Sequence, residues 1–210
     1  MTATLAPAVA GLQEAVLSVF DIESIARPMC EVGRYRRIVL PDAPPQQFAV
    51  WHVPPSCKRI EQLLLVPPDS AIRGGCLRLV KFHGVPQRVM RSSQRSWDTG
   101  GIFDVDVFTT DVDRVYRELQ RHGWTALGEP VNYTEAHFRV RQVVAVGPSG
   151  FMLAMIQRFS PPVEGLGADT PMSPVFNSTQ MVRDFEAGTR FYTEVLGWQK
   201  SLDFTIDNAA

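Results

Sequence analysis

The sequence is poor in the residues that build metal sites and disulfide frameworks. Its 210 residues include four histidines and three cysteines. Cys30, Cys57 and Cys76 are odd in number and far apart, and no Cys-x-x-Cys spacing occurs. This pattern argues against a disulfide scaffold and a structural zinc site. It favours reduced thiols in a cytoplasmic protein.

Long apolar runs and an excess of one charge are also absent. No run approaches the length that spans a membrane. The first ten residues lack the basic start of a signal peptide, and residues 1–11 are expected to be a loose leader. A net charge of -1 argues against nucleic acid as a partner. We therefore expect neither a membrane nor a nucleic acid among the partners.

The most regular stretch, residues 102–159, predicts a strand, a helix and three more strands. Ile102–Phe108 alternates apolar and polar residues, the period of a half-buried strand. Asp111 is a typical helix N-cap, and Gly123 suits the C-terminal end of that helix. The further strands are expected around Val131–Tyr133, Phe138–Val146 and Phe151–Gln157. A single βαβββ unit leaves one sheet face bare, so a partner unit is expected.

The same order of elements occurs upstream, before residue 84. Glu14–Phe20 is a predicted strand, and Asp21 precedes a helix that Pro28 is expected to distort or end early. Further strands are predicted at Tyr35–Leu40, Gln47–His52, Ile60–Val66 and Cys76–Phe82.

The pattern begins a third time downstream, which gives a repeat of about 80 to 90 residues. Val175–Val182 is a predicted strand, Asp184 a predicted N-cap, and Trp198–Ile206 the start of another strand. The expected organisation is a leader 1–11, module one 12–83, a connector 84–100, module two 101–159, a Pro/Gly linker 160–172 and an incomplete third module 173–210.

The third fragment cannot bury its own helix. Two explanations stand. Either the chain was cut from a longer four-module protein, which is the explanation we favour, or the fragment docks on a second copy in a homodimer.

Three motifs resemble the vicinal oxygen chelate superfamily, which holds the glyoxalase I, bleomycin-resistance and extradiol-dioxygenase proteins. They are Arg121–Trp124 with Gly128–Pro130, Gly147–Phe151 running into Gln157, and Phe191–Trp198. The resemblance implies an α+β fold of tandem βαβββ modules that pair into a cupped, eight-stranded mixed sheet with helices on the outside. It also implies a ligand cleft, and a divalent metal in many members, often held by the last two of four modules.

The resemblance places metal ligands on the first and last strand of a module, and this sequence departs from that pattern. The first-strand positions are Glu14, Asp104 and Asn177. The last-strand positions are Ala154 in module two and Arg78 or Leu79 in module one, depending on which glycine sets the register. Alanine cannot coordinate an ion, and arginine repels one. No cofactor is therefore predicted, unless C-terminal modules supply metal ligands.

Strand parity assigns the residues of the first strand of module two to two faces. Phe103, Val105 and Val107 are expected beneath the helix, and Asp104, Asp106 and Phe108 in the cleft. From module one, Glu14, Val16, Ser18 and Phe20 are expected to face the same cleft.

Glu14 and Asp104 are the candidate catalytic pair, because burial raises one carboxyl pKa and creates a general acid beside a general base. The alternative, which we favour, is that these acids pair with Arg78, Arg139 or Arg141 and hold the modules together.

Two groups of basic residues remain. His52 and His137 fall on or beside strands and could meet across the cleft. Arg88, Arg91 and Arg95 in the connector are expected to form a solvated face, with anion binding as the lesser alternative.

Two functions follow as hypotheses. The first is metal-free binding of a small hydrophobic or aromatic ligand, either by a complete binding module or by the N-terminal part of a larger glyoxalase- or dioxygenase-like protein. The expected cleft residues are Arg78, Phe20, Phe108, Met152, Ala154, His52 and His137. The second is a dioxygenase, lyase or isomerase acting on a small oxygenated substrate, with metal in further C-terminal modules or with acid–base chemistry by Asp104 and Glu14.

Overall fold

The computed structural model describes residues 11–68, 74–91, 95, 98, 101–135 and 137–203. The chain divides into two compact units. One is Gly11–Met181, which carries two complete βαβββ modules. The described part of the other is residues 182–203. Apart from Gly11, the predicted leader lies outside the described residues.

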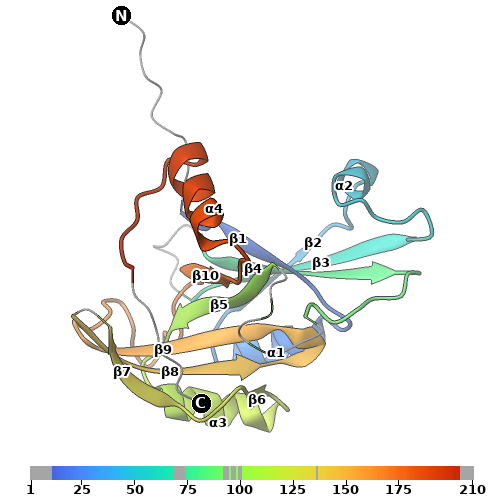
Figure 1. Cartoon of the computed structure of the whole chain (residues 1–210). Coiled ribbons are helices and arrows are strands. Elements are labelled where there is room, and N and C mark those ends of the chain that lie inside the picture. Colours follow the sequence, from blue (N-terminus) through green and yellow to red (C-terminus); the bar gives the residue numbers. More distant parts are fainter. Residues whose placement is uncertain are drawn as a thin grey trace, which may run out of the picture. The chain divides into compact units, whose positions relative to one another are not determined.

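The first module forms a four-stranded sheet in the order β1-β4-β3-β2 (Figure 1). Strand β1 runs parallel to β4, and the other neighbours are antiparallel. Its elements are β1 (Glu14–Ser18), α1 (Glu23–Glu31), β2 (Arg36–Leu40), α2 (Pro45–Val50), β3 (Arg59–Val66) and β4 (Cys76–His83). The first strand of this module thus pairs with its last, which is the order that a βαβββ unit requires.

One local prediction in the first module is wrong, and one of two alternatives for a second is contradicted. Residues 47–52 were expected to form a strand, but Pro45–Val50 is helix α2. Pro44 is extended and Pro45 stands at the first helical position, where the missing N–H has no intrahelical role. Helix α1 also continues through Pro28, because Ile25 and Met29 on either side are fully buried and hold the helix in place.

The second module repeats this order and follows its prediction closely (Figure 1). Strand β5 runs parallel to β9, which pairs antiparallel with β8. The Asp111 carboxylate accepts a 2.9 Å hydrogen bond from the Arg114 backbone N–H, so the predicted N-cap is confirmed. The elements are β5 (Ile102–Phe108), α3 (Val112–Arg121), β6 (Thr125–Ala126), β7 (Val131–Glu135), β8 (Phe138–Val146), the 3-10 turn η1 (Pro148–Gly150) and β9 (Met152–Ser160).

The α+β architecture of tandem βαβββ modules is confirmed, and its backbone hydrogen bonds divide the strands into a four-stranded and a six-stranded sheet. The sixth strand, β10 (Asn177–Gln180), comes from the start of the predicted third module. It pairs antiparallel with β5, with Asn177 opposite Asp106 and Thr179 opposite Asp104. The strand predicted for the third module therefore completes the sheet of module two.

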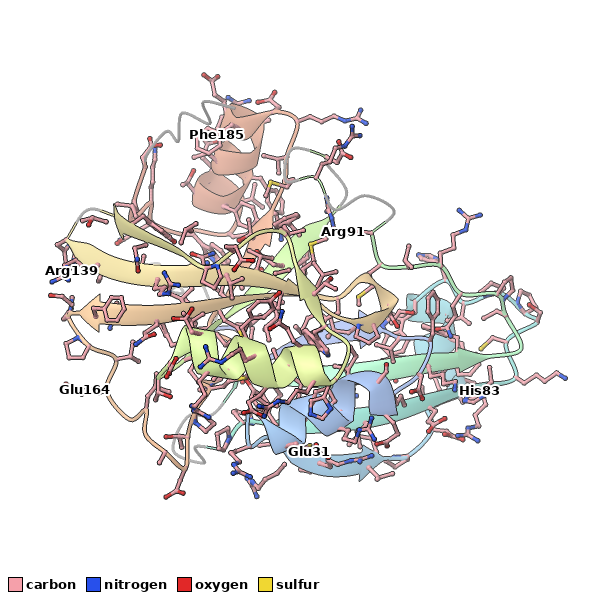
Figure 2. The ribbon with its side chains drawn as sticks, turned by 90° about the horizontal axis from the view of Figure 1, so that it is seen from below. Glu31, His83, Arg91, Arg139, Glu164 and Phe185 are labelled. Atoms are coloured by element: carbon pink, nitrogen blue, oxygen red, sulfur yellow. The ribbon has the colours of Figure 1, made fainter. Side chains whose placement is uncertain are left out.

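One apolar core serves both modules. Helices α1 and α3 lie side by side over it, and His122 Nε2 at the end of α3 is 3.4 Å from Glu31 Oε2 at the end of α1 (Figure 2). Val105 and Val107 enter this core as predicted. Phe103 does not, because it packs in a separate cluster with Val146 and Met152.

The second unit contains α4 (Phe185–Arg190) and the π-helical turn η2 (Phe191–Val195). The Asp184 carboxylate caps α4 by accepting a 2.8 Å hydrogen bond from the Ala187 backbone N–H, as predicted. The strand expected from Trp198 is absent over residues 198–203, and the rest of that prediction lies outside the described residues. None of the described helices is long and apolar enough to cross a membrane.

Candidate functional site

Glu14 and Arg78 form an ion pair on the neighbouring strands β1 and β4. Arg78 Nε donates to both Glu14 carboxylate oxygens at 3.1 Å, and Nη2 donates to Oε2 at 2.9 Å. Arg78 Nη1 also donates to Gln62 Oε1 on β3 at 3.1 Å. Leu79, the alternative in the register, is fully buried in the core. Glu14 is therefore paired with an arginine, as the alternative favoured from the sequence predicted. The ion pair lies within module one and does not join the two modules.

The residues at the expected ligand positions do not fit a divalent metal. The Arg78 guanidinium already occupies the carboxylate that Glu14 would offer. Ala154, which is almost fully buried opposite Asp106, has no donor atom. Among the described residues, no group of three or more His, Cys, Asp or Glu side chains could hold a metal ion.

Asp104 and Asp106 form a buried carboxyl pair on alternate positions of β5. Their exposed fractions are 4% and 6%. Burial, followed by the negative charge of Asp104, raises the pKa of Asp106 to about 7. Burial also raises the pKa of Asp104, while hydrogen bonds with Thr179 and Asp106 and the charge of Arg91 act in the opposite direction. The two carboxyls therefore titrate as a pair, and Asp106 exchanges its proton near neutral pH.

Strand β10 supplies the polar partners of this pair. Asn177 Nδ2 donates a 2.9 Å hydrogen bond to Asp106 Oδ2. Thr179 lies opposite Asp104 in the strand register. Sequence parity placed Asp106 in the cleft, but it did not reveal that Asp106, rather than Glu14, is the carboxyl neighbour of Asp104.

Arg91 is the functional candidate that sequence reasoning placed on a solvated face. Its guanidinium carbon lies 5.0 Å from the centre of the Phe103 ring, and Nη2 donates to the Asp98 carbonyl oxygen at 2.6 Å. Figure 2 labels Arg91 in the connector before β5. Its Nε and Nη1 atoms are buried without a partner in the described part of the chain, as is Asp104 Oδ1. Both residues line a cavity of about 230 Å³.

A larger cavity of about 410 Å³ lies at the carboxyl end of β5. The rings of Phe108 and Phe176 stack with their centres 4.0 Å apart and their planes at 1°, and both line the cavity. Ser173 fixes the segment that carries Phe176, because its N–H donates to the Phe108 carbonyl at 2.9 Å and its hydroxyl accepts from the Phe108 N–H at 2.8 Å. The remaining apolar side chains of the lining are Leu12, Val163, Leu166, Met172, Pro174 and Val175.

The structure distributes the other predicted cleft residues over different places. Phe20 is 41% exposed, and its backbone N–H donates to Ser149 Oγ at 2.9 Å. Met152 lines the 230 Å³ cavity with Asp104. His52 lines a third cavity of about 310 Å³ after α2. The His137 ring lies 4.0 Å from the ring of Phe138.

The two histidines therefore have separate surroundings. No hydrogen bond or ion pair joins His52 or His137 to Asp104 or Glu14 within the part of the chain that the structure describes. Arg141, proposed as a partner of these acids, instead binds Asp113 through two 2.9 Å hydrogen bonds.

Comparison with known proteins identifies the fold. A glyoxalase family protein from Bacillus cereus is similar with a TM-score of 0.56 and 16% identity, over 76% of this chain and 96% of that one. Glyoxalase I from Zea mays gives a TM-score of 0.55 and 18% identity, over 89% of this chain and 55% of that one. A candidate dioxygenase from Bacillus subtilis gives a TM-score of 0.59 and 9% identity, over 93% of this chain and 57% of that one.

These similarities show the vicinal oxygen chelate fold that the motifs predicted. The chain spans about half the length of the maize and Bacillus subtilis proteins. No family model matches the sequence. No curated protein matches it either.

Proposed function

We propose that this glyoxalase-like chain binds a small apolar or aromatic molecule, without a metal ion, in the 410 Å³ cavity. The observation that carries the proposal is the stacked pair of Phe108 and Phe176, which forms a flat apolar wall in that cavity. Small-molecule sites have volumes of about 300 to 1,000 Å³ and mostly apolar linings. A planar ring seated against this wall would gain both area burial and ring stacking.

Metal independence is proposed from the residues at the family's ligand positions. Arg78 brings a fixed positive charge to one of them and engages Glu14. A divalent ion there would have to displace the guanidinium and would be repelled by it. The ligand is therefore expected to be held by shape and apolar contact, with affinity unaffected by chelators.

The test is calorimetric titration with indole and with toluene, each in buffer containing EDTA. The intact protein is expected to bind at least one of these probes. Phe108→Ala should weaken binding about tenfold or more, which corresponds to loss of about 1.4 kcal/mol of ring contact. Phe159→Ala, an exposed phenylalanine that does not line the cavity, is the matched control. Equal affinities for both variants, or binding that requires added metal, would reject the proposal.

A second candidate function is an enzyme that moves protons on a small oxygenated substrate. The buried pair of Asp104 and Asp106 favours it, because Asp106, with a pKa of about 7, can give and take a proton near neutral pH beside a second carboxyl. Glu14 is replaced in this role by Asp106, since Arg78 engages Glu14.

Deuterium exchange tests this second function. Incorporation of solvent deuterium beside the carbonyl group of dihydroxyacetone, followed by proton NMR, should occur with the intact protein and stop in Asp104→Asn. Glu14→Gln should retain the exchange. Identical spectra with and without the protein would argue against proton transfer on this probe and leave ligand binding as the better candidate.

A further inference from the structure

We propose that the 230 Å³ cavity beside β5 is a second site, which binds a small aromatic or apolar carboxamide through Arg91 and Asp104. This site is separate from the cavity lined by Phe108, and it does not depend on ligand binding there. Its polar end is formed by Arg91 from the connector and Asp104 from β5. Its apolar lining includes Val16, Met90, Phe103 and Met152.

The site contains polar atoms that the protein itself does not satisfy. Asp104 is 4% exposed, and its Oδ1 atom has no hydrogen-bond partner among the described residues. The same holds for the buried Nε and Nη1 atoms of Arg91. A buried polar group without a partner costs free energy, because it has lost its contact with water without gaining a hydrogen bond. A ligand that supplies the missing partners recovers this free energy, so these three atoms define what the ligand must offer.

Arg91 can only donate hydrogen bonds, whereas an ionised carboxylate can only accept them. Burial raises the pKa of Asp104, while the hydrogen bonds with Thr179 and Asp106 and the charge of Arg91 act against that rise. In either protonation state the carboxyl keeps oxygen lone pairs that accept hydrogen bonds. The ligand must therefore place an acceptor toward Arg91 and a donor toward Asp104. A primary amide carries both groups on one carbon, since its carbonyl oxygen accepts and its N–H donates.

Other polar groups match less well. A carboxylate would bind Arg91 but would leave Asp104 Oδ1 unsatisfied, because an ionised carboxylate has no donor. An ester or ketone would leave Asp104 Oδ1 unsatisfied, because neither has a donor. An ammonium group would be repelled by Arg91. The pair thus selects a neutral amide over its charged or donor-free analogues, in the way that buried unpaired groups produce specificity.

The rest of the cavity indicates the substituent on the amide. Its lining is mainly apolar, and the Arg91 guanidinium itself covers the Phe103 ring at 5.0 Å. A volume of about 230 Å³ accommodates one aromatic ring with its amide, given that a water molecule takes about 30 Å³. Benzamide is therefore the probe, and benzoate and methyl benzoate are its matched analogues.

The experiment measures the affinities of these three probes for the intact protein by ligand-observed NMR or calorimetry. Benzamide is expected to bind at least tenfold more tightly than benzoate or methyl benzoate. Because this series uses the unaltered chain, folding of a variant does not affect it. Equal affinity for all three probes, tighter binding of benzoate, or no binding of any probe would overturn the proposal.

Variants then locate the site. Arg91→Met keeps the length of the side chain and removes its donors, so it should reduce benzamide affinity at least tenfold. Arg88→Met, an arginine of the same connector that does not line this cavity, should leave the affinity unchanged. Indole affinity, measured on both variants, should also stay unchanged. Loss of benzamide binding in Phe108→Ala but not in Arg91→Met would assign the probe to the larger cavity and reject the second site.

Discussion

Asn177 Nδ2 donates a hydrogen bond of 2.9 Å to Asp106 Oδ2 and thereby ties β10 to a buried carboxyl of β5. This donated hydrogen bond lowers the pKa of Asp106, but burial and the charge of Asp104 outweigh it. Asn177→Asp should replace this donor by a third carboxylate. We expect a loss of about 1 to 3 kcal/mol in the free energy of unfolding at pH 7.

Urea denaturation at pH 7 measures this loss. Asn132→Asp is the control, because Asn132 is exposed on β7 and lies opposite Arg141 in the register. The control should change the free energy of unfolding by less than about 0.5 kcal/mol. A similar effect of the two substitutions would mean that the contact with Asp106 contributes nothing specific.

The raised pKa of Asp106 makes stability depend on pH. Its pKa is about 7 in the folded chain, against about 3.9 for a free aspartate. The folded state therefore holds a proton that the unfolded state has lost, so this contribution is complete below pH 4 and is lost as the pH rises to 7. The slope reaches at most about 1.4 kcal/mol per pH unit.

Asp106→Asn should remove this dependence, because the amide has the shape of the protonated carboxyl and never ionises. We expect the free energy of unfolding of the variant to exceed that of the unaltered protein by about 4 kcal/mol at pH 8 and to equal it near pH 4. Thermal and urea melts across pH 4 to 8 measure both values. Parallel stability profiles for the two proteins would show that Asp106 titrates as an ordinary aspartate.

Metal content tests whether the chain binds a metal ion although Arg78 and Ala154 stand at positions where the resemblance places metal ligands. Protein purified without chelator, then incubated with iron, manganese, zinc or magnesium, should carry far less than one ion per chain. The reason is that Arg78 engages Glu14 and that Ala154 has no donor atom. Plasma mass spectrometry after gel filtration measures the content. A near-stoichiometric ion would reveal a site that these residues do not explain.

Gly75 lies where the start of β4 meets the segment that leads into β10. Its N–H donates to the Leu12 carbonyl at 2.8 Å, and its carbonyl accepts from the Val175 N–H at 3.0 Å. A Cβ atom here would lie 2.5 Å from both Pro174 Cβ and the Val175 carbonyl oxygen, at a φ of +67°. Gly75→Ala should therefore lower the free energy of unfolding by about 2 to 5 kcal/mol.

Gly123→Ala is the matched control, because φ is +81° there and nothing lies within 4 Å of the added atom. It should lower the free energy of unfolding by only about 1 to 2 kcal/mol, which is the cost of holding an alanine in the left-handed backbone conformation. Denaturant melts of both variants give the difference, which measures the clash alone. Gly75→Ala should also weaken indole binding, since Gly75, Pro174 and Val175 all line the 410 Å³ cavity. A stable variant with full affinity would contradict this account.

Local periodicity was sufficient to predict the two modules. The alternation of Ile102–Phe108 and the caps at Asp111 and Asp184 depend on neighbours within a few residues, and the structure confirms them. The prediction of a strand at residues 47–52 is wrong, and its cause is also local, because Pro45 starts a helix there. Apolar content alone does not separate a short strand from a short helix.

The candidate site depends on contacts that sequence spacing does not contain. Asn177 and Asp106 are 71 residues apart, and no periodic pattern predicts that β10 would pair with β5. Arg91 looked like a surface residue because it lies in a connector rich in Arg, Ser and Gln, yet it covers Phe103. The pairing of Glu14 with Arg78 was accessible from sequence, because the resemblance placed both residues at one site of the module.

The position of β10 also bears on aggregation. Without it, β5 would present a row of unpaired backbone N–H and C=O groups, which is a template for pairing with other chains. With β10 in place, β5 is an interior strand, and the outermost strand is the polar sequence Asn-Ser-Thr-Gln. Residues 177–180 therefore protect module two from aggregation by covering the edge of β5. Substitutions that weaken the pairing of β10 with β5 would expose this edge and promote self-association.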